Sequence, residues 1–230
     1  MSDPINPPVD SPEYPPELAR LPPGRHGLPR EFVSHNQRER LIAGLAEAVA
    51  ENGYAGTTIA HITRHAAVSR RTFYEHFNSK DECFLAAYDT VMSELRQRVG
   101  EAFDQEEEWP RAVRAGIAAM LEFLVAEPHL ARLSMVEALV AGPVVVERYD
   151  AAIQSLVPYF AAGREGRSPE VLAGLSPATE EALVGGMVSL VSRRIFADRT
   201  EELESLLPDL VEFTLTPYLG SAEAARVARA

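Results

Sequence analysis

The chain has 230 residues, 46% of them hydrophobic, and a formal net charge of −12 at pH 7. That much apolar material can bury a sizeable core in one or two domains. Charges interrupt the longest apolar runs, and the amino terminus lacks the basic and apolar regions of a secretory signal. The single cysteine excludes an internal disulfide. We therefore expect a cytoplasmic protein that does not enter the membrane.

The charge is spread unevenly along the chain. Residues 1–19 hold four acidic and no basic side chains, residues 20–80 hold nine Lys or Arg against five acids, and residues 81–230 hold thirteen against twenty-five. Attraction to phosphate falls off within about 8 Å at physiological salt, so a local basic excess matters more than the total. The segment 20–80 is therefore compatible with a nucleic-acid partner.

Residues 1–35 are predicted to form a disordered arm, because nine of the seventeen prolines lie within the first thirty positions. The end of this arm, residues 20–30, is basic. Such a stretch either enters a DNA minor groove or serves as a solubilising tail. From Asn36 to Asn52 the chain carries an amphipathic stripe that Gly53 ends, and this pattern predicts the first helix.

Two short helices with a shared core are predicted next. Thr58 can cap a helix that runs through Arg64, and Ser69 can cap a second helix. In the second helix Phe73 and Phe77 lie four residues apart and therefore on one side. The opposite side is cationic and aromatic, which suits an element that enters a major groove. The pattern favours DNA recognition over an ordinary polar helix face.

A set of short motifs between Asn36 and Tyr88 extends this pattern. The motifs are Gly53-Tyr54, Thr57-Thr58-Ile59, Ile62, Val68-Ser69, Arg71-Thr72-Phe73-Tyr74, His76-Phe77 and Ser79-Lys80-Asp81-Glu82. With these motifs at this spacing, the chain resembles the amino-terminal DNA-binding region of TetR-family transcriptional regulators. It departs from that family at Ala67, where glycine is usual, and at Arg71, which replaces a small residue. A positive φ at Ala67 would cost about 1–2 kcal/mol of strain.

The residues expected to contact DNA have distinct roles. Arg71 points away from the aromatic core and can bond a guanine edge, and Thr72 can touch a thymine methyl or a phosphate. Glu75 either accepts from a cytosine amine or is a solvated charge. The ring of Tyr74 contacts phosphate, seals the small core, or does both. Phosphate contacts that set the register are assigned to Thr58, Ser69, Arg70, Tyr74, His76 and Lys80.

Downstream, capping residues, glycines and prolines predict an all-helical bundle. A capping box at Ser79 starts a helix through Glu101, and Gly163–Ser176 is the least regular stretch. Other helices are expected over residues 109–126, 128–142, 143–162, 177–197 and 200–219, the last bent at Pro208. The expected fold is all-α. It has a three-helix helix-turn-helix domain at 36–82, a ligand-binding and dimerisation bundle at 83–219, and a flexible tail at 220–230.

The resemblance implies a homodimer whose bundle holds a small molecule. Its last two long helices would form the interface, through Leu183, Gly186, Met187, Leu190, Leu210 and Phe213. Gly186 favours either close approach of another helix or a kink beside a pocket. Large flexible or aromatic side chains can line an adaptable cavity. The candidates are Met92, Trp109, Met120, Phe123, Met135, Tyr149 and Phe160.

These observations predict a sequence-specific DNA-binding transcriptional regulator, a repressor that a small-molecule effector releases from double-stranded operator DNA. The alternative is a helical ligand-binding or scaffold protein without DNA recognition. Catalysis has no support, since no nucleophile–base pair, glycine-rich phosphate loop or metal signature stands out. His61 and His65 have a zinc-compatible spacing but no further ligands nearby, so polar surface groups are the favoured reading and no cofactor is predicted.

Overall fold

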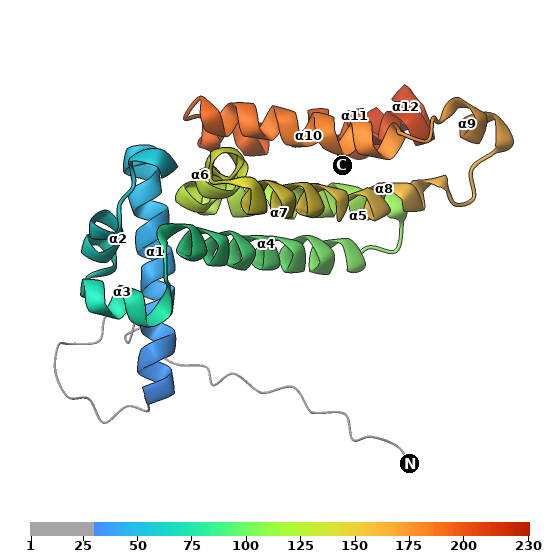
Figure 1. Cartoon of the computed structure of the whole chain (residues 1–230). Helices are drawn as coiled ribbons and strands as arrows, with labels where there is room; N and C mark the ends of the chain where they lie inside the picture. Colours follow the sequence, from blue (N-terminus) through green and yellow to red (C-terminus); the bar gives the residue numbers. More distant parts are fainter. Residues whose placement is uncertain (1–29) are drawn as a thin grey trace, which may run out of the picture.

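The computed structural model describes residues 30–230 (Figure 1). Every regular element in this part of the chain is helical, and none of these helices is long and apolar enough to span a membrane. The elements are α1 (Arg30–Gly56), α2 (Ile59–Ala66), α3 (Arg70–His76), α4 (Lys80–Asp104), α5 (Trp109–Ala126), α6 (Pro128–Met135), η2 (Glu137–Val140), α7 (Pro143–Gln154), α8 (Val157–Ala161), η3 (Ala162–Arg164), α9 (Pro169–Gly174), α10 (Thr179–Phe196), η4 (Thr200–Leu206), α11 (Leu207–Leu219) and α12 (Ser221–Ala228).

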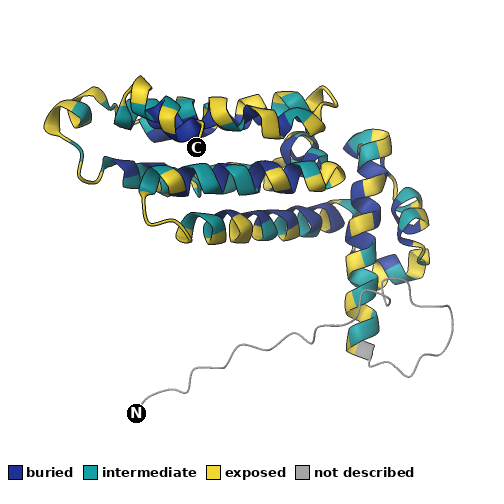
Figure 2. Ribbon diagram, turned by 180° about the vertical axis from the view of Figure 1, so that it is seen from behind, coloured by how far each residue is buried: buried dark blue, intermediate teal, exposed yellow. Residues whose placement is uncertain are grey.

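The helices form two regions. Helices α1, α2 and α3 make a small unit at one end, with α1 crossing the long direction of the bundle (Figure 1). The bundle is layered, with α4 in one layer, α5, α7 and α8 in the next, and α10, α11 and α12 in the third. Buried residues on these helices face the neighbouring layers (Figure 2). Because α1 packs against α4, α6 and η2, the small unit is joined directly to the bundle.

The first helix begins earlier than expected. It starts at Arg30, six residues ahead of Asn36, so the predicted disordered arm is wrong for residues 30–35. Phe32 and Val33 are half-buried, and they extend the apolar stripe of α1 by one more turn. The rest of that prediction, residues 1–29, lies outside the described residues. At the other end Gly53 interrupts the helix with φ 67°, as the sequence predicted.

The three predicted amino-terminal caps are confirmed. The side chains of Thr58, Ser69 and Ser79 each accept the backbone N–H three residues ahead, at 3.3, 3.0 and 3.1 Å. These bonds fix the starts of α2, α3 and α4 by satisfying amides that have no partner inside a helix. The far ends differ slightly, because α2 runs to Ala66 and α4 runs to Asp104.

The bundle helices are more broken than predicted. The segment 128–142 divides into α6 and the 3-10 turn η2, and 143–162 divides into α7 and α8. The stretch 163–176 contains η3 and α9. In the last segment Pro208 lies in the first turn of α11 and does not bend a continuous helix. Proline fits this position because first-turn amides need no partner within the helix.

The carboxyl-terminal residues are not a flexible tail. Gly220, with φ 77°, turns the chain back, and Ser221–Ala228 forms α12. Ala224, Val227 and Ala228 are buried, and α12 packs against α11 and α5. The short run of alanines therefore contributes a small apolar face to the core, which corrects the prediction for 220–230.

Candidate DNA-reading surface and bundle cavities

The inner side of α3 is fixed by two phenylalanines. Phe73 and Phe77 are buried, and their ring centroids lie 5.9 Å apart. The Arg38 guanidinium of α1 lies 5.5 Å from the centroid of the Phe77 ring, so the packing extends to the first helix. This small core orients α3, and residues 30–230 leave the opposite side of the helix uncovered.

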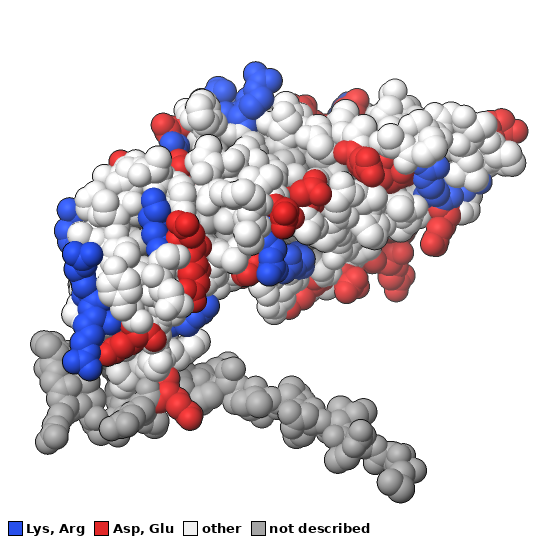
Figure 3. Space-filling model, in the orientation of Figure 1, with Lys and Arg blue, Asp and Glu red and all other residues white. Residues whose placement is uncertain are grey.

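The outer side of α3 is exposed and cationic. Arg70 and Arg71 are exposed, and the Arg71 side chain retains 90% of its accessible surface. Tyr74 is 52% exposed, while its ring meets Phe73 edge-on at a centroid distance of 5.5 Å. The ring therefore supports the core and also presents a surface to solvent. Lys and Arg atoms lie along the molecular edge where α2 and α3 are found, as Figure 3 shows.

Arg71 is paired on its own helix. Its Nε lies 3.0 Å from Glu75 Oε1, across one helical turn. Both side chains are exposed, and such a pair contributes only about 0.3–0.5 kcal/mol. Arg71 can therefore leave Glu75 for a stronger acceptor, while Glu75 is left either to accept from a base or to remain solvated.

The turn between α2 and α3 is tight. Ala67 adopts φ 51° and ψ 44°, the left-handed conformation that glycine tolerates best. The amides of Ala67 and Val68 bond back to the carbonyls of Arg64 and Thr63, at 3.2 and 3.1 Å. Arg40 Nη2 donates to the Ala67 carbonyl at 2.9 Å. These three bonds hold alanine in a strained backbone region and so fix the angle between the two helices.

The remaining predicted contacts on the turn side are placed as follows. Thr58 and Ser69 are exposed but act as helix caps. Thr72 is half-buried, and its hydroxyl lies 2.9 Å from Ser69 Oγ. These side chains thus shape the ends of α2 and α3 and border the face that carries Arg71.

Lys80 is not a free phosphate ligand. Its Nζ donates to the carbonyl oxygens of Tyr54 and Thr57 at 2.8 and 3.1 Å and lies 4.0 Å from the centroid of the Tyr54 ring. The ammonium is therefore used to hold the start of α4 against the end of α1. A phosphate contact of Lys80 stays a prediction beside this structural role.

His76 is also only partly available. It is half-buried, and its Nε2 lies 3.4 Å from Gln37 Oε1 on α1. Burial lowers the pKa of His76, with Glu75 opposing and Arg38 assisting the shift. A neutral imidazole packed on α1 is a weaker phosphate ligand than an exposed cation, so its predicted role in setting the register is reduced.

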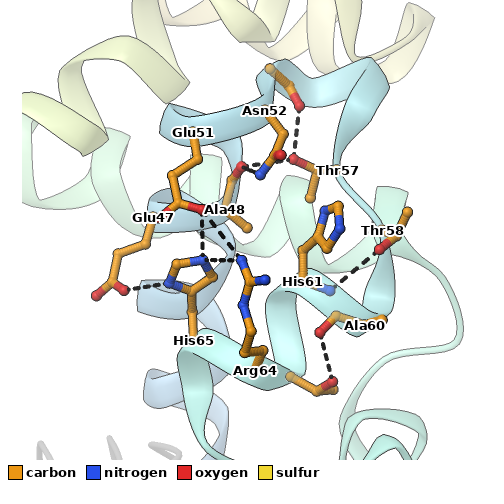
Figure 4. A network of polar contacts seen from close by, with 12 residues as sticks. Glu47, Ala48, Glu51, Asn52, Thr57, Thr58, Ala60, His61, Arg64 and His65 are labelled. Atoms are coloured by element: carbon orange, nitrogen blue, oxygen red, sulfur yellow. Dashed lines mark hydrogen bonds and ion pairs between the residues drawn. The ribbon is translucent and has the colours of Figure 1, made fainter.

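A cluster of polar contacts fixes α2 on α1 (Figure 4). His65 Nδ1 lies 2.9 Å from Glu47 Oε2, and His65 Nε2 lies 3.2 Å from Glu51 Oε2. Arg64 Nη2 also reaches Glu51, at 3.4 Å. His65 is thus a structural partner of two glutamates. Among residues 30–230, no three His, Cys, Asp or Glu side chains are arranged to hold a metal ion.

The DNA-reading unit and the bundle meet at Tyr54, directly after the Gly53 break. The Tyr54 amide donates to Glu137 Oε2 at 2.8 Å, and the Tyr54 hydroxyl bonds to Asp81 Oδ1. Glu137 belongs to η2 and Asp81 to α4, so one residue contacts the bundle on two sides. This junction, formed by Gly53, Tyr54, Asp81 and Glu137, ties α1 to the bundle through two hydrogen bonds.

Two apolar cavities lie inside the bundle. One, of about 50 Å³, is lined by four of the predicted residues, Met92, Met120, Met135 and Tyr149. The other, of about 30 Å³, is lined by Met120 and Phe160. Val99, Met120 and Leu156 border both.

Trp109 and Phe123 line neither cavity. Trp109 donates from Nε1 to the Tyr159 carbonyl at 2.8 Å and packs edge-on against Tyr218. Phe123 is buried, and Arg98 lies over its ring. Both rings fill gaps between helices, which is the more common fate of an aromatic residue in a helical bundle.

The predicted interface residues fall into two groups. Leu183, Met187 and Leu210 are buried within the protomer and are therefore not available to a partner. Leu190 and Phe213 are 38% and 43% exposed. A Cβ at Gly186 would lie 3.0 Å from Phe213 Cζ, so this glycine permits close approach of α11 within the same chain.

Sequence reasoning missed Glu137, Tyr88 and Arg96. Glu137 is buried and stands alone among apolar residues from Met135 to Val140, a pattern that signals a buried partner. Tyr88 and Arg96 line the larger cavity. Their spacing of eight residues places them on one side of α4, but the sequence does not reveal which helix that side meets.

Comparisons with known proteins agree with this geometry. A family described as "Bacterial regulatory proteins, tetR family" matches residues 41–87. The chain is 26% identical over 204 residues to the HTH-type transcriptional regulator EthR of Mycolicibacterium smegmatis, covering 86% of this chain and 89% of that protein. It is 29% identical over 99 residues to the nucleoid occlusion factor SlmA of Vibrio cholerae, covering 43% of this chain and 50% of that protein.

A solved structure, the fatty acid degradation regulator FadR from Bacillus halodurans, shares the fold. It aligns with a TM-score of 0.68 at 14% identity and covers 80% of this chain and 95% of that one. The exposed face of α3 on a three-helix unit, together with the family match, indicates a helix-turn-helix DNA-binding regulator of transcription. Within that class, residues 41–87 match the tetR family of bacterial regulatory proteins, and the chain is similar over most of its length to the regulator EthR.

Proposed function

We propose that this protein is a cytoplasmic repressor that binds operator DNA as a homodimer and leaves it when a small molecule enters the bundle. The observation that carries the proposal is the exposed face of α3, with Arg70, Arg71 and Tyr74 directed away from the Phe73 core. In this proposal Arg71 reads a base edge, while Arg70 and Tyr74 contact phosphates.

The dimer would form through the outer surface of α10 and α11. Three large apolar side chains, Leu190, Phe196 and Phe213, are exposed there. A two-fold axis through this surface pairs the same residues from each protomer. The two α3 helices would then read a pseudo-palindrome whose half-sites lie about 34–36 Å apart, or a multiple of that spacing.

Release of the repressor from operator DNA would begin with a shift of the helices that line the larger cavity. Met92 belongs to α4 and Met135 to α6, and Met135 lies two residues before Glu137, which bonds the Tyr54 amide. An effector that favours a shifted α4 and α6 therefore also favours a shifted α1 and a wrong spacing of the two α3 helices. Linkage requires operator DNA to weaken effector binding by the same factor, a coupling of about 1–3 kcal/mol.

The proposal is tested by selecting bound fragments from the organism's own genome and titrating them with wild-type protein and two variants. Arg71→Ala should weaken operator binding about tenfold or more. Arg98→Ala is the matched control, because Arg98 forms a similar exposed pair with Glu94 one turn away on α4. It should change affinity less than about twofold. If wild-type protein binds no fragment at low salt, the scaffold or ligand-binding alternative replaces the regulator.

A further inference from the structure

The larger cavity contains a buried polar atom without a partner. Tyr88 is 1% exposed and lines this cavity, and its hydroxyl makes no hydrogen bond with any of residues 30–230. An unsatisfied buried hydroxyl costs about 1–3 kcal/mol, so buried polar atoms are normally paired. A ligand that supplies the missing partner would remove this cost, which makes Tyr88 a candidate contact for the effector.

The Tyr88 hydroxyl requires an acceptor. Burial raises the pKa of Tyr88 well above its usual value, and the Tyr149 ring nearby adds to the shift. The phenol therefore keeps its proton and acts as a donor at any physiological pH. A matching ligand group is a carbonyl or carboxylate oxygen.

Arg96 supplies a positive charge at the same cavity. It lies two turns after Tyr88 on α4, it is exposed, and it forms no ion pair with any of residues 30–230. A cation beside a donor favours an anionic acceptor over a neutral one. The guanidinium also remains in water, so no buried charge has to be compensated before a ligand arrives.

The rest of the lining is apolar and elongated. The two cavities share Val99, Met120 and Leu156, and the smaller one extends to Phe103 and Phe160. Along α4 the lining therefore runs from Tyr88 to Phe103, about 22 Å at 1.5 Å per residue. Tyr88 and Arg96 lie toward the α1 end, whereas the lining at the far end is apolar except for Tyr159 and therefore suits a hydrocarbon.

From this arrangement we infer that the effector is an elongated apolar molecule headed by a carboxylate, which accepts a hydrogen bond from Tyr88 and faces Arg96 while its tail extends toward Phe103. The inference rests on the proposed function, because it names the chemical class of the molecule that enters the bundle. Tyr88 and Arg96 are then specificity-determining residues.

The test is calorimetric titration of the full-length protein with decanoate and with 2-decanone, which has a neutral acceptor. Tyr88→Phe should weaken decanoate binding about tenfold. Tyr74→Phe is the matched control, since Tyr74 lies on α3 and lines neither cavity. It should change decanoate affinity less than about twofold. Arg96→Gln should weaken decanoate severalfold and leave 2-decanone unchanged.

A second readout separates recognition from a structural role. Because the Tyr88 hydroxyl has no partner in the protein, Tyr88→Phe should not lower the thermal unfolding midpoint of the ligand-free protein. A lowered midpoint, equal decanoate affinities for wild type and Tyr88→Phe, or no saturable decanoate binding would each overturn the inference. Binding of 2-decanone as tight as that of decanoate would overturn the carboxylate and the role of Arg96.

Failure of the inference is distinguishable from failure of the proposed function. If wild-type protein binds operator fragments but not decanoate, the effector class is wrong and the regulator stands. If decanoate binds through Tyr88 but no genomic fragment is bound, the ligand class stands and the regulator is wrong. Both outcomes are measured on the same protein preparation, by one titration with genomic fragments and one with decanoate.

Discussion

The interior of the DNA-reading unit, formed by α1, α2 and α3, is packed differently from the interior of the bundle. In the reading unit Phe73 and Ile62 are fully buried, and the buried Thr57 hydroxyl donates to the Ala48 and Gly53 carbonyls, at 3.0 and 2.7 Å. The bundle instead contains two small apolar cavities, of about 30 and 50 Å³. Close packing favours a single shape, whereas cavities lower the cost of rearrangement. The reading unit is thus built to move as one body, and the bundle to adapt.

The comparison predicts a larger penalty for truncation in the reading unit. Phe73→Ala should lower the free energy of unfolding by about 5 kcal/mol and abolish operator binding. Phe160→Ala should cost nearer to about 3 kcal/mol, because the ring already faces a cavity and loses fewer contacts. Urea unfolding of both variants measures the difference. Equal costs would contradict the contrast in packing between the two regions.

The next largest effect is expected from a substitution at the junction around Tyr54. Glu137→Ala leaves the Tyr54 amide without its acceptor and should lower the free energy of unfolding by about 2 kcal/mol. It should also weaken the response of operator binding to an effector more than it weakens operator binding itself. Glu137→Gln keeps an acceptor oxygen and is the matched control.

These two outcomes are separated by titrating operator DNA with and without effector. Should Glu137→Ala respond to effector as fully as wild type, the junction is not the route between the regions, and α4 alone carries the signal. Should Glu137→Gln lose the response as well, the charge and not the hydrogen bond matters, and the contact with Arg132 at 3.5 Å becomes the relevant one.

The strained turn predicts a stabilising substitution in the reading unit. Ala67→Gly relieves about 1–2 kcal/mol of strain and costs about 0.5–1 kcal/mol of backbone entropy. The expected net gain is under about 1 kcal/mol, seen as a higher thermal midpoint. Operator affinity should hold, since the three bonds around the turn remain possible. A lower midpoint would show that the turn is not strained at Ala67.

The smallest expected effect is a pH dependence of stability at His76. Because its pKa is lowered in the folded protein, the unfolded chain takes up a proton first as the pH falls below about 6.5. Protonation therefore favours unfolding, and the contribution of His76 is present above that pH and lost below it. His76→Gln should flatten this part of the urea-midpoint profile, and an unchanged profile would contradict the assignment to His76.

Local signals made the reading unit predictable. Capping hydroxyls at Thr58, Ser69 and Ser79 and the Phe73/Phe77 spacing depend on neighbours in sequence, and each lies where expected. The structural role of Lys80 was not predicted, because its partners Tyr54 and Thr57 lie far from it in the sequence. A helix period shows that a side chain faces another element but does not name that element.

The bundle was harder to predict for the same reason. Prolines and glycines predicted the bounds of α5 well. They predicted the bounds over 128–162 poorly, because the 3-10 turn η2 interrupts this segment where it packs against α1. A rule that favours large flexible or aromatic residues selects both Met92 and Trp109 as cavity-lining candidates. Only the arrangement of helices separates the cavity wall from the filled core.

Operator binding across a series of salt concentrations tests the central claim, that one face of α3 reads DNA. Wild type, Arg70→Ala and Arg71→Ala are compared on the operator and on base-substituted versions. We predict that Arg70→Ala reduces the salt slope by about one with sequence preference kept, and that Arg71→Ala relaxes preference at one base pair in each half-site. Unchanged slopes and unchanged preferences in both variants would contradict the account.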